Sequence, residues 1–211
     1  MTANTTLHIV GNGPSVDYFN RIDWPSDDLV IGCNFSDIKY NPNFTVMMDI
    51  KPFMKFYQGY TTKIPLVISK RCESFVVNEK KGWDKLTPDV FLLADVIEMT
   101  HDSDKPYPMN SGQHATLYGI AQRATTTVVH LWGLDSFWSS SLSSRTDAFV
   151  ERSTEPRTRP KVAKCWKLYW EQIFAKHSNI SFIVHAPVDV EINFTMIHMN
   201  NFGVQYHENT R

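Results

Sequence analysis

The sequence predicts an α/β fold in which helices flank a mostly parallel β-sheet. Short apolar runs recur along the chain with turn residues between them. Their Val, Ile, Leu and Phe content is nearly continuous rather than alternating with polar residues, as a sheet covered on both faces requires. Helical stretches separate several of these runs, and alternation of strands with helices is typical of α/β proteins. The 211 residues, 42% of them hydrophobic, are enough to bury one full core.

The individual elements follow from these patterns in chain order. The expected strands are residues 7–10, 29–34, 44–49, 64–69, 90–94, 127–132 and 180–185. Helices are expected at residues 111–124 and 161–176, where apolar side chains recur at helical spacing. The serine-rich residues 139–145 offer little to bury and are expected to form a loop. Because this length and composition can bury one full core, we expect one domain over residues 1–211.

Composition excludes several functional classes. The formal net charge of −1 gives no general basic field for nucleic acids, so a charged ligand must be recognised locally. The three cysteines, Cys33, Cys72 and Cys165, are widely spaced and indicate neither a disulfide framework nor a zinc site. Residues 1–6 lack the features of a signal peptide, and no apolar run approaches the ~18 residues of a membrane span. We therefore expect a cytoplasmic protein without a transmembrane segment.

Residues 11–15, Gly-Asn-Gly-Pro-Ser, follow the first expected strand directly. Glycines allow positive φ angles and a close approach of the backbone to a ligand. Ser15 is expected to cap a short helix whose exposed N–H groups face an anion such as phosphate. The spacing matches neither the dinucleotide-binding Gly-x-Gly-x-x-Gly motif nor the P-loop. The alternative is a turn that only reverses the chain.

Polar residues follow other expected strands at the corresponding position. The second and third expected strands end at Asn34 and Asp49, Asp135 follows the sixth, and residues 110–112, Asn-Ser-Gly, open a helix. Ligands of open parallel sheets bind beyond the carboxyl ends of the strands. Asn side chains can both donate to and accept from a nucleobase, while hydroxyl and helix N–H groups suit ribose or phosphate. Individually, each of these residues is also an ordinary cap or turn residue.

Three motifs together resemble the bacterial sialyltransferases of glycosyltransferase family forty-two and related motility-associated glycosyltransferases. The motifs are IVGNGPS, IGCNFSD and MNSGQHATLYGIAQRATTTVVHLWGLDSFW. The resemblance covers about two thirds of the chain and fades between residues 50 and 108. It implies a Rossmann-like domain of glycosyltransferase A type that binds a CMP- or UDP-linked sugar without a metal. The expected donor-binding residues are Gly11, Asn12, Gly13, Ser15, Asn34, Asn110, Ser111 and Gly112.

The chain departs from this family where the family places its catalytic histidine and its phosphate-binding tyrosines. The corresponding segment, residues 151–170, contains no His and no Tyr before Tyr169. Inverting transfer needs a base near the acceptor hydroxyl, and Asp49 and Asp135 are the candidates at the carboxyl edge. His101 and His114 are the alternatives for the base, and a turn cap is the alternative role for Asp135.

Cationic residues before the last long helix are candidates for binding phosphate or the acceptor: Arg145, Arg152, Arg157, Arg159 and Lys161. The aromatic residues that follow, Trp166, Tyr169 and Trp170, have core spacing and are expected to be buried. We expect no cofactor. The alternative is that Asp102 and Asp104, in an Asp-x-Asp pattern, hold Mg²⁺ or Mn²⁺ on a diphosphate.

The sequence leaves the acceptor and the class of function open. The expected function is sugar transfer from a nucleotide donor to an acceptor hydroxyl of either a glycan or a modified DNA base. One alternative is a bacteriophage-type enzyme, in the host cytoplasm, that modifies hydroxymethylated pyrimidines in DNA. This alternative relies on the basic run at residues 152–167. The other is a catalytically inactive nucleotide-binding module, which the missing histidine favours. The oligomeric state is open.

Overall fold

The computed structural model describes residues 5–34, 40–50, 53–54, 64–69, 72–74, 78, 90–92, 109–137, 160–192 and 199–208. Within these residues, eight strands form one sheet in the order β5-β4-β3-β2-β1-β6-β7-β8. They are β1 (Thr5–Val10), β2 (Leu29–Cys33), β3 (Phe44–Met47), β4 (Leu66–Ile68), β5 (Val90–Leu92), β6 (Thr126–Trp132), β7 (Ser181–Pro187) and β8 (Phe202–His207). Every neighbouring pair is parallel. The predicted fold class is confirmed.

The strand order contains one topological switch point. The chain starts in the middle of the sheet at β1 and moves outward through β2, β3 and β4 to β5. It then returns to β6 on the other side of β1 and moves outward again to β8. The switch point therefore lies between β1 and β6, where a Rossmann-like sheet opens its ligand crevice.

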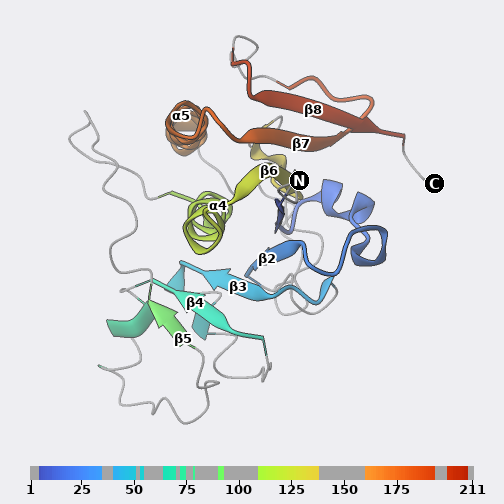
Figure 1. Cartoon of the computed structure of the whole chain (residues 1–211). Helices are drawn as coiled ribbons and strands as arrows, with labels where there is room; N and C mark the ends of the chain where they lie inside the picture. The colour runs from blue at the N-terminus through green and yellow to red at the C-terminus, as the bar shows by residue number, and fades with distance from the viewer. Residues whose placement is uncertain are drawn as a thin grey trace.

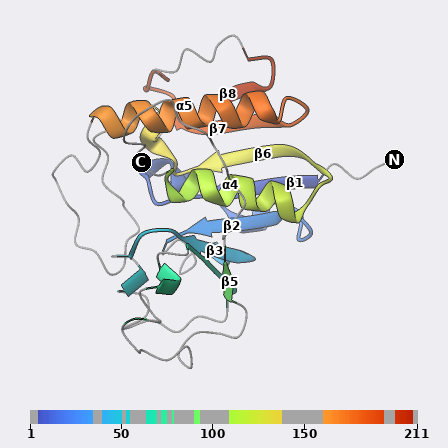
Figure 2. The ribbon, with the colours of Figure 1, turned by 90° about the vertical axis from the view of Figure 1, so that its left-hand side faces the viewer.

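Helices cover the sheet on both faces. The helices α4 (Ser111–Gln122) and α5 (Pro160–Lys176) lie on one face, and Figure 2 shows both in front of the strands. The short 3₁₀ helices η1 (Pro14–Tyr18) and η2 (Arg21–Asp23) lie on the opposite face (Figure 1). The main core fills the space between the sheet and α4 and α5. A smaller cluster, which includes Val16, Phe19 and Trp132, lies under η1.

Helix α4 packs unusually close to the sheet. Gly119 faces β1 and β2, and a Cβ atom at this position would lie 2.6 Å from Leu7 Cδ2 and 2.9 Å from Ile31 Cδ1. A side chain at this position would displace the buried side chains of Leu7 and Ile31. The helix starts at the carboxyl edge of the sheet and ends at the amino edge, where Arg123 Nη1 donates to the carbonyl of Asp27 at 2.8 Å.

Helix α5 buries the aromatic residues of its C-terminal half. Tyr169 is 3% exposed and Trp170 is fully buried, as expected, while Trp166 is partly buried against the same core. Phe174 stacks near Trp170 and contacts Phe182 of β7 with ring centroids 4.5 Å apart. These side chains hold α5 against β6, β7 and β8, the half of the sheet on the far side of the switch point from β2.

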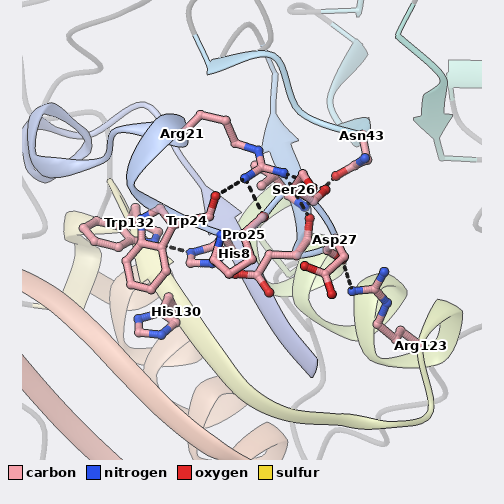
Figure 3. Close-up of polar contacts among 12 residues, drawn as sticks. His8, Arg21, Trp24, Pro25, Ser26, Asp27, Asn43, Arg123, His130 and Trp132 are labelled. Carbon is pink, nitrogen blue, oxygen red and sulfur yellow. Dashed lines mark hydrogen bonds and ion pairs between the residues drawn. The ribbon is translucent and has the colours of Figure 1, made fainter. Parts of the chain in front are cut away.

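Arg21 holds the loop that leads into β2 at the amino edge of the sheet (Figure 3). Its Nη1 donates to the carbonyls of Trp24 at 3.3 Å and Pro25 at 2.9 Å. Its Nη2 donates to the carbonyls of Ser26 at 3.2 Å and Asp28 at 3.4 Å. One guanidinium group therefore satisfies four backbone carbonyls of this loop and holds the loop in a tight turn.

The structure extends the expected elements in two respects. All seven expected strands and both expected helices are present with small shifts at their ends, but the edge strand β8 was not expected. The short helix after β1 is a 3₁₀ helix of five residues. The serine-rich residues 139–145 lie outside the described part of the chain, and the single domain over residues 1–211 stays a prediction. Among the described helices, none combines the length and apolar character needed to cross a membrane.

Candidate functional site

Four of the sequence-predicted site residues follow consecutive strands of the sheet. Asp49 comes after β3, Asn34 after β2, Asn12 after β1 and Asp135 after β6. Because all these strands are parallel, the four residues lie along one carboxyl edge. The N-terminus of α4 reaches the same edge. The site is therefore centred on the switch point between β1 and β6.

Two turns meet at this switch point, residues 11–15 after β1 and residues 133–135 after β6, and we call them the paired turns. The N–H of Gly11 donates to the carbonyl of Trp132 at 2.7 Å, and the N–H of Gly13 donates to the carbonyl of Gly133 at 2.9 Å. Gly133 has a φ of 63°, which favours glycine. Side chains at Gly11 or Gly13 would overlap the Gly133 carbonyl or the Asp135 carboxylate.

The paired turns are locked by Ser15 and Asp135. The backbone N–H of Ser15 donates to Oδ2 of Asp135 at 3.0 Å, and the Ser15 hydroxyl donates to Oδ1 at 2.5 Å. Ser15 Oγ in turn accepts from the N–H of Gly133 at 2.9 Å. Ser15 is fully buried and Asp135 is 3% exposed. Both carboxylate oxygens of Asp135 therefore bind the protein's own turn.

This arrangement corrects the expectation that Ser15 caps a helix. The N-cap of η1 is Gly13, and no side chain caps that helix. Pro14 occupies the first turn, so it contributes no N–H there. The Ser15 hydroxyl is instead committed to Asp135 and Gly133. Asp135 has the contacts of a turn cap, which is the alternative role expected for it, because its carboxylate accepts from the N–H and the hydroxyl of Ser15.

Asn12 and Asn34 lie at the ends of β1 and β2. Asn12 Nδ2 donates to the carbonyl of Cys33 at 2.8 Å, which fixes the amide against the end of β2. Asn34 adopts a left-handed backbone with a φ of 56°. Thr45 Oγ1 donates to the Asn34 carbonyl at 2.9 Å. Asn34 Oδ1 is buried and, within the described residues, has no hydrogen-bond partner.

The N-terminus of α4 is held by a capping box. The Asn110 side chain accepts from the Gln113 N–H at 2.9 Å, and the Gln113 side chain accepts from the Asn110 N–H at 3.0 Å. The first two helical N–H groups, those of Ser111 and Gly112, have no intrahelical partner because they belong to the first turn. These two N–H groups lie at the carboxyl edge of the sheet and form the N-terminal end of α4, which carries a positive partial charge.

Leu134 joins the paired turns to α4. A Cβ atom on Gly11 would lie 2.7 Å from Leu134 Cδ2, and one on Gly112 would lie 2.6 Å from the same atom. The leucine side chain thus fills a space that exists only because both positions are glycine. This contact sets the distance between the turn after β1 and the first turn of α4.

Two other candidate bases are described by the structure. Asp49 is exposed beyond the end of β3, and its carbonyl accepts from the N–H of Phe53 at 3.2 Å. His114 lies in the first turn of α4, and burial lowers its pKa to about 4. Its Nδ1 is buried and has no partner among the described residues. His114 is therefore neutral near pH 7. Cys33, beside Asn34, is no nucleophile because burial raises its pKa to about 12.

Several expected residues lie outside the described part of the chain: His101, Asp102, Asp104, Arg145, Arg152, Arg157 and Arg159. Lys161 lies in α5, but only its backbone is described. Within the described residues, no group of three His, Cys, Asp or Glu side chains converges on one point.

Sequence reasoning missed Gly133 and Leu134 as parts of the site. Gly133 supplies a carbonyl and an N–H to the paired turns, and the Leu134 side chain packs against Gly11 and Gly112. The signal was present, because Gly-Leu-Asp follows directly on a buried strand, as Gly-Asn-Gly does after β1. A glycine directly after a buried strand indicates a backbone turn in which a side chain does not fit.

The parallel sheet, its switch point and the glycine turn at the end of β1 define a Rossmann-like α/β fold with a polar site at the carboxyl edge. This fold is similar to that of sialyltransferases from Campylobacter jejuni. The monofunctional alpha-2,3-sialyltransferase Cst-I matches with a TM-score of 0.54 and 15% identity, over 96% of this chain and 80% of that chain. The sialyltransferase CstII in complex with CMP-3FNeuAc matches with a TM-score of 0.52 and 16% identity, over 92% and 84%.

A third match is CstII in complex with a trisaccharide acceptor and CMP, with a TM-score of 0.51 and 17% identity, over 85% of this chain and 80% of that chain. No protein-family model matches the chain, and no curated protein matches it by sequence. The resemblance seen in the three sequence motifs is confirmed at the level of the fold.

Proposed function

We propose that the protein is a glycosyltransferase that transfers a sugar from a CMP-linked donor to an acceptor hydroxyl of a saccharide, with UDP as the second nucleotide to test. The observation that carries the proposal is Asn34. Its buried Oδ1 has no partner among the described residues, and leaving such an acceptor unsatisfied costs about 1–3 kcal/mol. A ligand hydroxyl or amino group at the carboxyl edge would satisfy it.

The rest of the edge suits a nucleotide. The N–H groups of Ser111 and Gly112 and the positive end of α4 can receive a phosphate. Asn12 is fixed at the same edge by its bond to the Cys33 carbonyl. The similarity to structures that contain CMP or a CMP-sugar analogue supports cytidine as the first base to test.

The two aspartates take different roles in this proposal. Asp135 is a positioning residue, because its carboxylate oxygens accept from Ser15 and hold the turn. Asp49 is exposed at the same edge and is the proposed general base, with His114 as the alternative. A neutral imidazole can also accept a proton, and a pKa of about 4 is no lower than the ordinary pKa of an Asp carboxylate. Asp49 is preferred because its side chain is exposed at the edge, whereas His114 Nδ1 is buried.

A saccharide is the proposed acceptor because one of the similar structures contains a trisaccharide acceptor. The DNA alternative rests on cations of which Arg152, Arg157 and Arg159 lie outside the described residues. It therefore enters only as an arm of the test.

The test has two stages. Calorimetry with CMP, UMP and GMP measures nucleotide binding, and a nucleotide at 100 times its Kd should raise stability by about 2.7 kcal/mol. Transfer from CMP- and UDP-linked sugars is then measured to a saccharide panel and to hydroxymethylated duplex DNA. No binding of any nucleotide contradicts the proposal. Binding without transfer or hydrolysis favours the inactive module, and transfer to DNA alone favours the DNA enzyme.

A further inference from the structure

Four histidines cross the face of the sheet that η1 and η2 cover. His8, His130, His185 and His207 lie on β1, β6, β7 and β8, which are consecutive in the sheet, and we call them the histidine row. His8 and His130 are register partners, with stacked rings 5.0 Å apart. From His130 onward, the row moves two residues toward the carboxyl edge at each strand.

Three of the rings form a continuous hydrogen-bonded chain. His130 Nδ1 lies 2.8 Å from His185 Nε2, and His185 Nδ1 lies 2.7 Å from His207 Nε2. His185 is fully buried, and His130 is 7% exposed. Each of the two contacts must contain one proton, since a nitrogen lone pair needs an N–H opposite it.

Counting protons shows how this chain responds to acid. Three neutral rings carry three protons, of which two lie in the contacts and one lies on an outer nitrogen, His130 Nε2 or His207 Nδ1. A first additional proton fills the other outer nitrogen and leaves both contacts intact. A second additional proton finds no free nitrogen, so it places two N–H groups opposite each other and breaks a contact.

His8 forms a second acid-sensitive contact at the start of the row (Figure 3). The indole N–H of Trp132, which can only donate, donates to His8 Nδ1 at 3.2 Å. The proton of neutral His8 must therefore be on Nε2, which lies 3.3 Å from Asp28 Oδ2. Protonation of Nδ1 would remove the acceptor for Trp132.

Burial keeps the row neutral near pH 7. Burial lowers the pKa of His8 to about 3, that of His130 to about 4 and that of His185 to about 2, and it also lowers the pKa of His207. Of the charged groups near the row, Arg21 of η2 acts on His8, and Asp28 before β2 acts on His130. Asp27 and Arg123 act in turn on Asp28. From η1, Tyr18 stacks on His207 with ring centroids 4.7 Å apart.

Trp132 connects the row to the paired turns. Its ring stacks on His185, with centroids 3.3 Å apart and planes 8° apart. Its carbonyl accepts from the N–H of Gly11, and Gly133 follows it directly. A change in the packing of the Trp132 ring therefore acts on the backbone that holds the turn after β1.

We propose that the histidine row is an acid-sensitive switch: protonation of His8 Nδ1, or uptake of more than one proton by the His130–His185–His207 chain, releases Trp132 and loosens the paired turns. The loss of nucleotide affinity that follows rests on the proposed function; the loosening of the turns does not. Acid should lower the stability of the fold, because folding and proton binding are linked. Lowered histidine pKa values mean that the unfolded chain binds more protons below pH 6.5, so stability is complete above about pH 6.5 and falls as the pH drops toward 4.

The experiment compares the wild type with three variants between pH 8 and pH 4.5. His185→Phe keeps an aromatic ring against Trp132 and cannot titrate, and His207→Gln removes the half-buried end of the row. Val184→Ala, beside His185 in β7, is the control because it lowers stability at every pH without removing a titratable group. Urea unfolding measures the equilibrium constant for folding. The protection of the Gly11 and Gly13 amides against hydrogen exchange, relative to their intrinsic rate at each pH, measures how firmly the paired turns are held.

In the wild type and in Val184→Ala, the folding constant should fall by more than tenfold per pH unit below pH 6, because more than one proton is taken up. His185→Phe and His207→Gln should each show a shallower fall, and His185→Phe should keep Gly11 and Gly13 protected at pH 5. Equal slopes in all four proteins would overturn the switch, as would unchanged exchange of both glycines in the wild type at pH 5.

A nucleotide arm separates this inference from the proposed function. The Kd of CMP is measured at pH 7.5 and pH 5 in His185→Phe and Val184→Ala, so that titration of the CMP phosphate itself cancels. We expect CMP to weaken at least tenfold more in Val184→Ala. An equal loss in both variants overturns the coupling to the site. If CMP fails to bind at any pH while the folding constants behave as expected, the proposed function fails and the switch stands.

Discussion

Ser15 and Asp135 are 120 residues apart in sequence, yet the hydroxyl and the backbone N–H of Ser15 donate to the two oxygens of the Asp135 carboxylate at 2.5 Å and 3.0 Å. The pair is buried and links the turn after β1 to the turn after β6. A carboxylate that receives two such bonds holds its turn rigid, so the geometry of the site depends on this contact.

Replacing either partner should therefore cost stability as well as ligand affinity. We expect Asp135→Ala to lower the free energy of unfolding by about 2–4 kcal/mol, because it leaves the buried Ser15 N–H and hydroxyl without their acceptor. Ser15→Ala should cost less, and the double variant should cost less than the sum of the two. Urea unfolding measures all three, and strict additivity would contradict a direct coupling.

Gly133 should not tolerate a side chain. Its φ of 63° strains any other residue, and a Cβ atom there would lie 2.9 Å from Val16 Cβ. We expect Gly133→Ala to destabilise the protein by about 1–3 kcal/mol. The control is Gly203→Ala in β8, where a Cβ atom would meet nothing within 4 Å, and its melting temperature should be within a few degrees of the wild type. Similar melting temperatures for both variants would refute the argument.

Asn34 should be needed for the ligand rather than for the fold. Glycine suits a φ of 56° better than Asn does, so Asn34→Gly should keep or slightly raise stability. It should also weaken CMP binding at least tenfold, because the buried amide oxygen is lost. Asn41→Gly is the matched control, since Asn41 has a φ of 44° and is exposed. Calorimetry that finds equal CMP affinity in both variants would exclude Asn34 from the site.

Arg21 should matter for stability alone. Its guanidinium donates to four backbone carbonyls at the amino edge, away from the proposed ligand (Figure 3). We expect Arg21→Ala to cost about 1–3 kcal/mol, and Arg21→Lys to recover little, because one ammonium group cannot reproduce the fork. The Kd of CMP should stay within twofold of the wild type. A large loss of CMP affinity would show that the loop before β2 reaches the site.

Sugar transfer should persist in EDTA. In the proposed site the phosphate is received by N–H groups at the start of α4, which supply positive potential without a metal. The measurement is turnover with EDTA and with added Mn²⁺. A strict requirement for Mn²⁺ would contradict this and direct attention to Asp102 and Asp104.

The parallel sheet could be predicted because its strands are buried on both faces and therefore appear as apolar runs. The edge strand β8 could not be recognised in this way, because its six residues include Gly203, Gln205 and His207 and only part of one face is covered. The alternation of Phe202, Val204 and Tyr206 was the remaining signal. Edge strands depart from the apolar pattern because half of their neighbours are missing.

The sequence predicted which candidate residues share one edge of the sheet, but not how their side chains bond. The ends of parallel strands meet at one edge by geometry, so Asn12, Asn34 and Asp135 could be grouped from their positions alone. The direction of each side chain depends on the turns, and a sequence does not show that Ser15 turns toward Asp135 rather than toward its own helix. The histidine row depends on strand register, which no local pattern contains.

The position of β1 in the middle of the sheet has a consequence for how the protein is made. The first strand of the chain can pair with β2 as soon as β2 has been synthesised, but its other edge stays open until β6, which begins at Thr126, has followed. The hydrogen bonds from Gly11 and Gly13 to β6 and its turn are contacts of high sequence separation, so they cannot form before β6 has been synthesised. A nascent chain that has reached only β5 would therefore expose the edge of β1 and would have no formed site. Ligand binding would therefore require that β1 has paired with both β2 and β6.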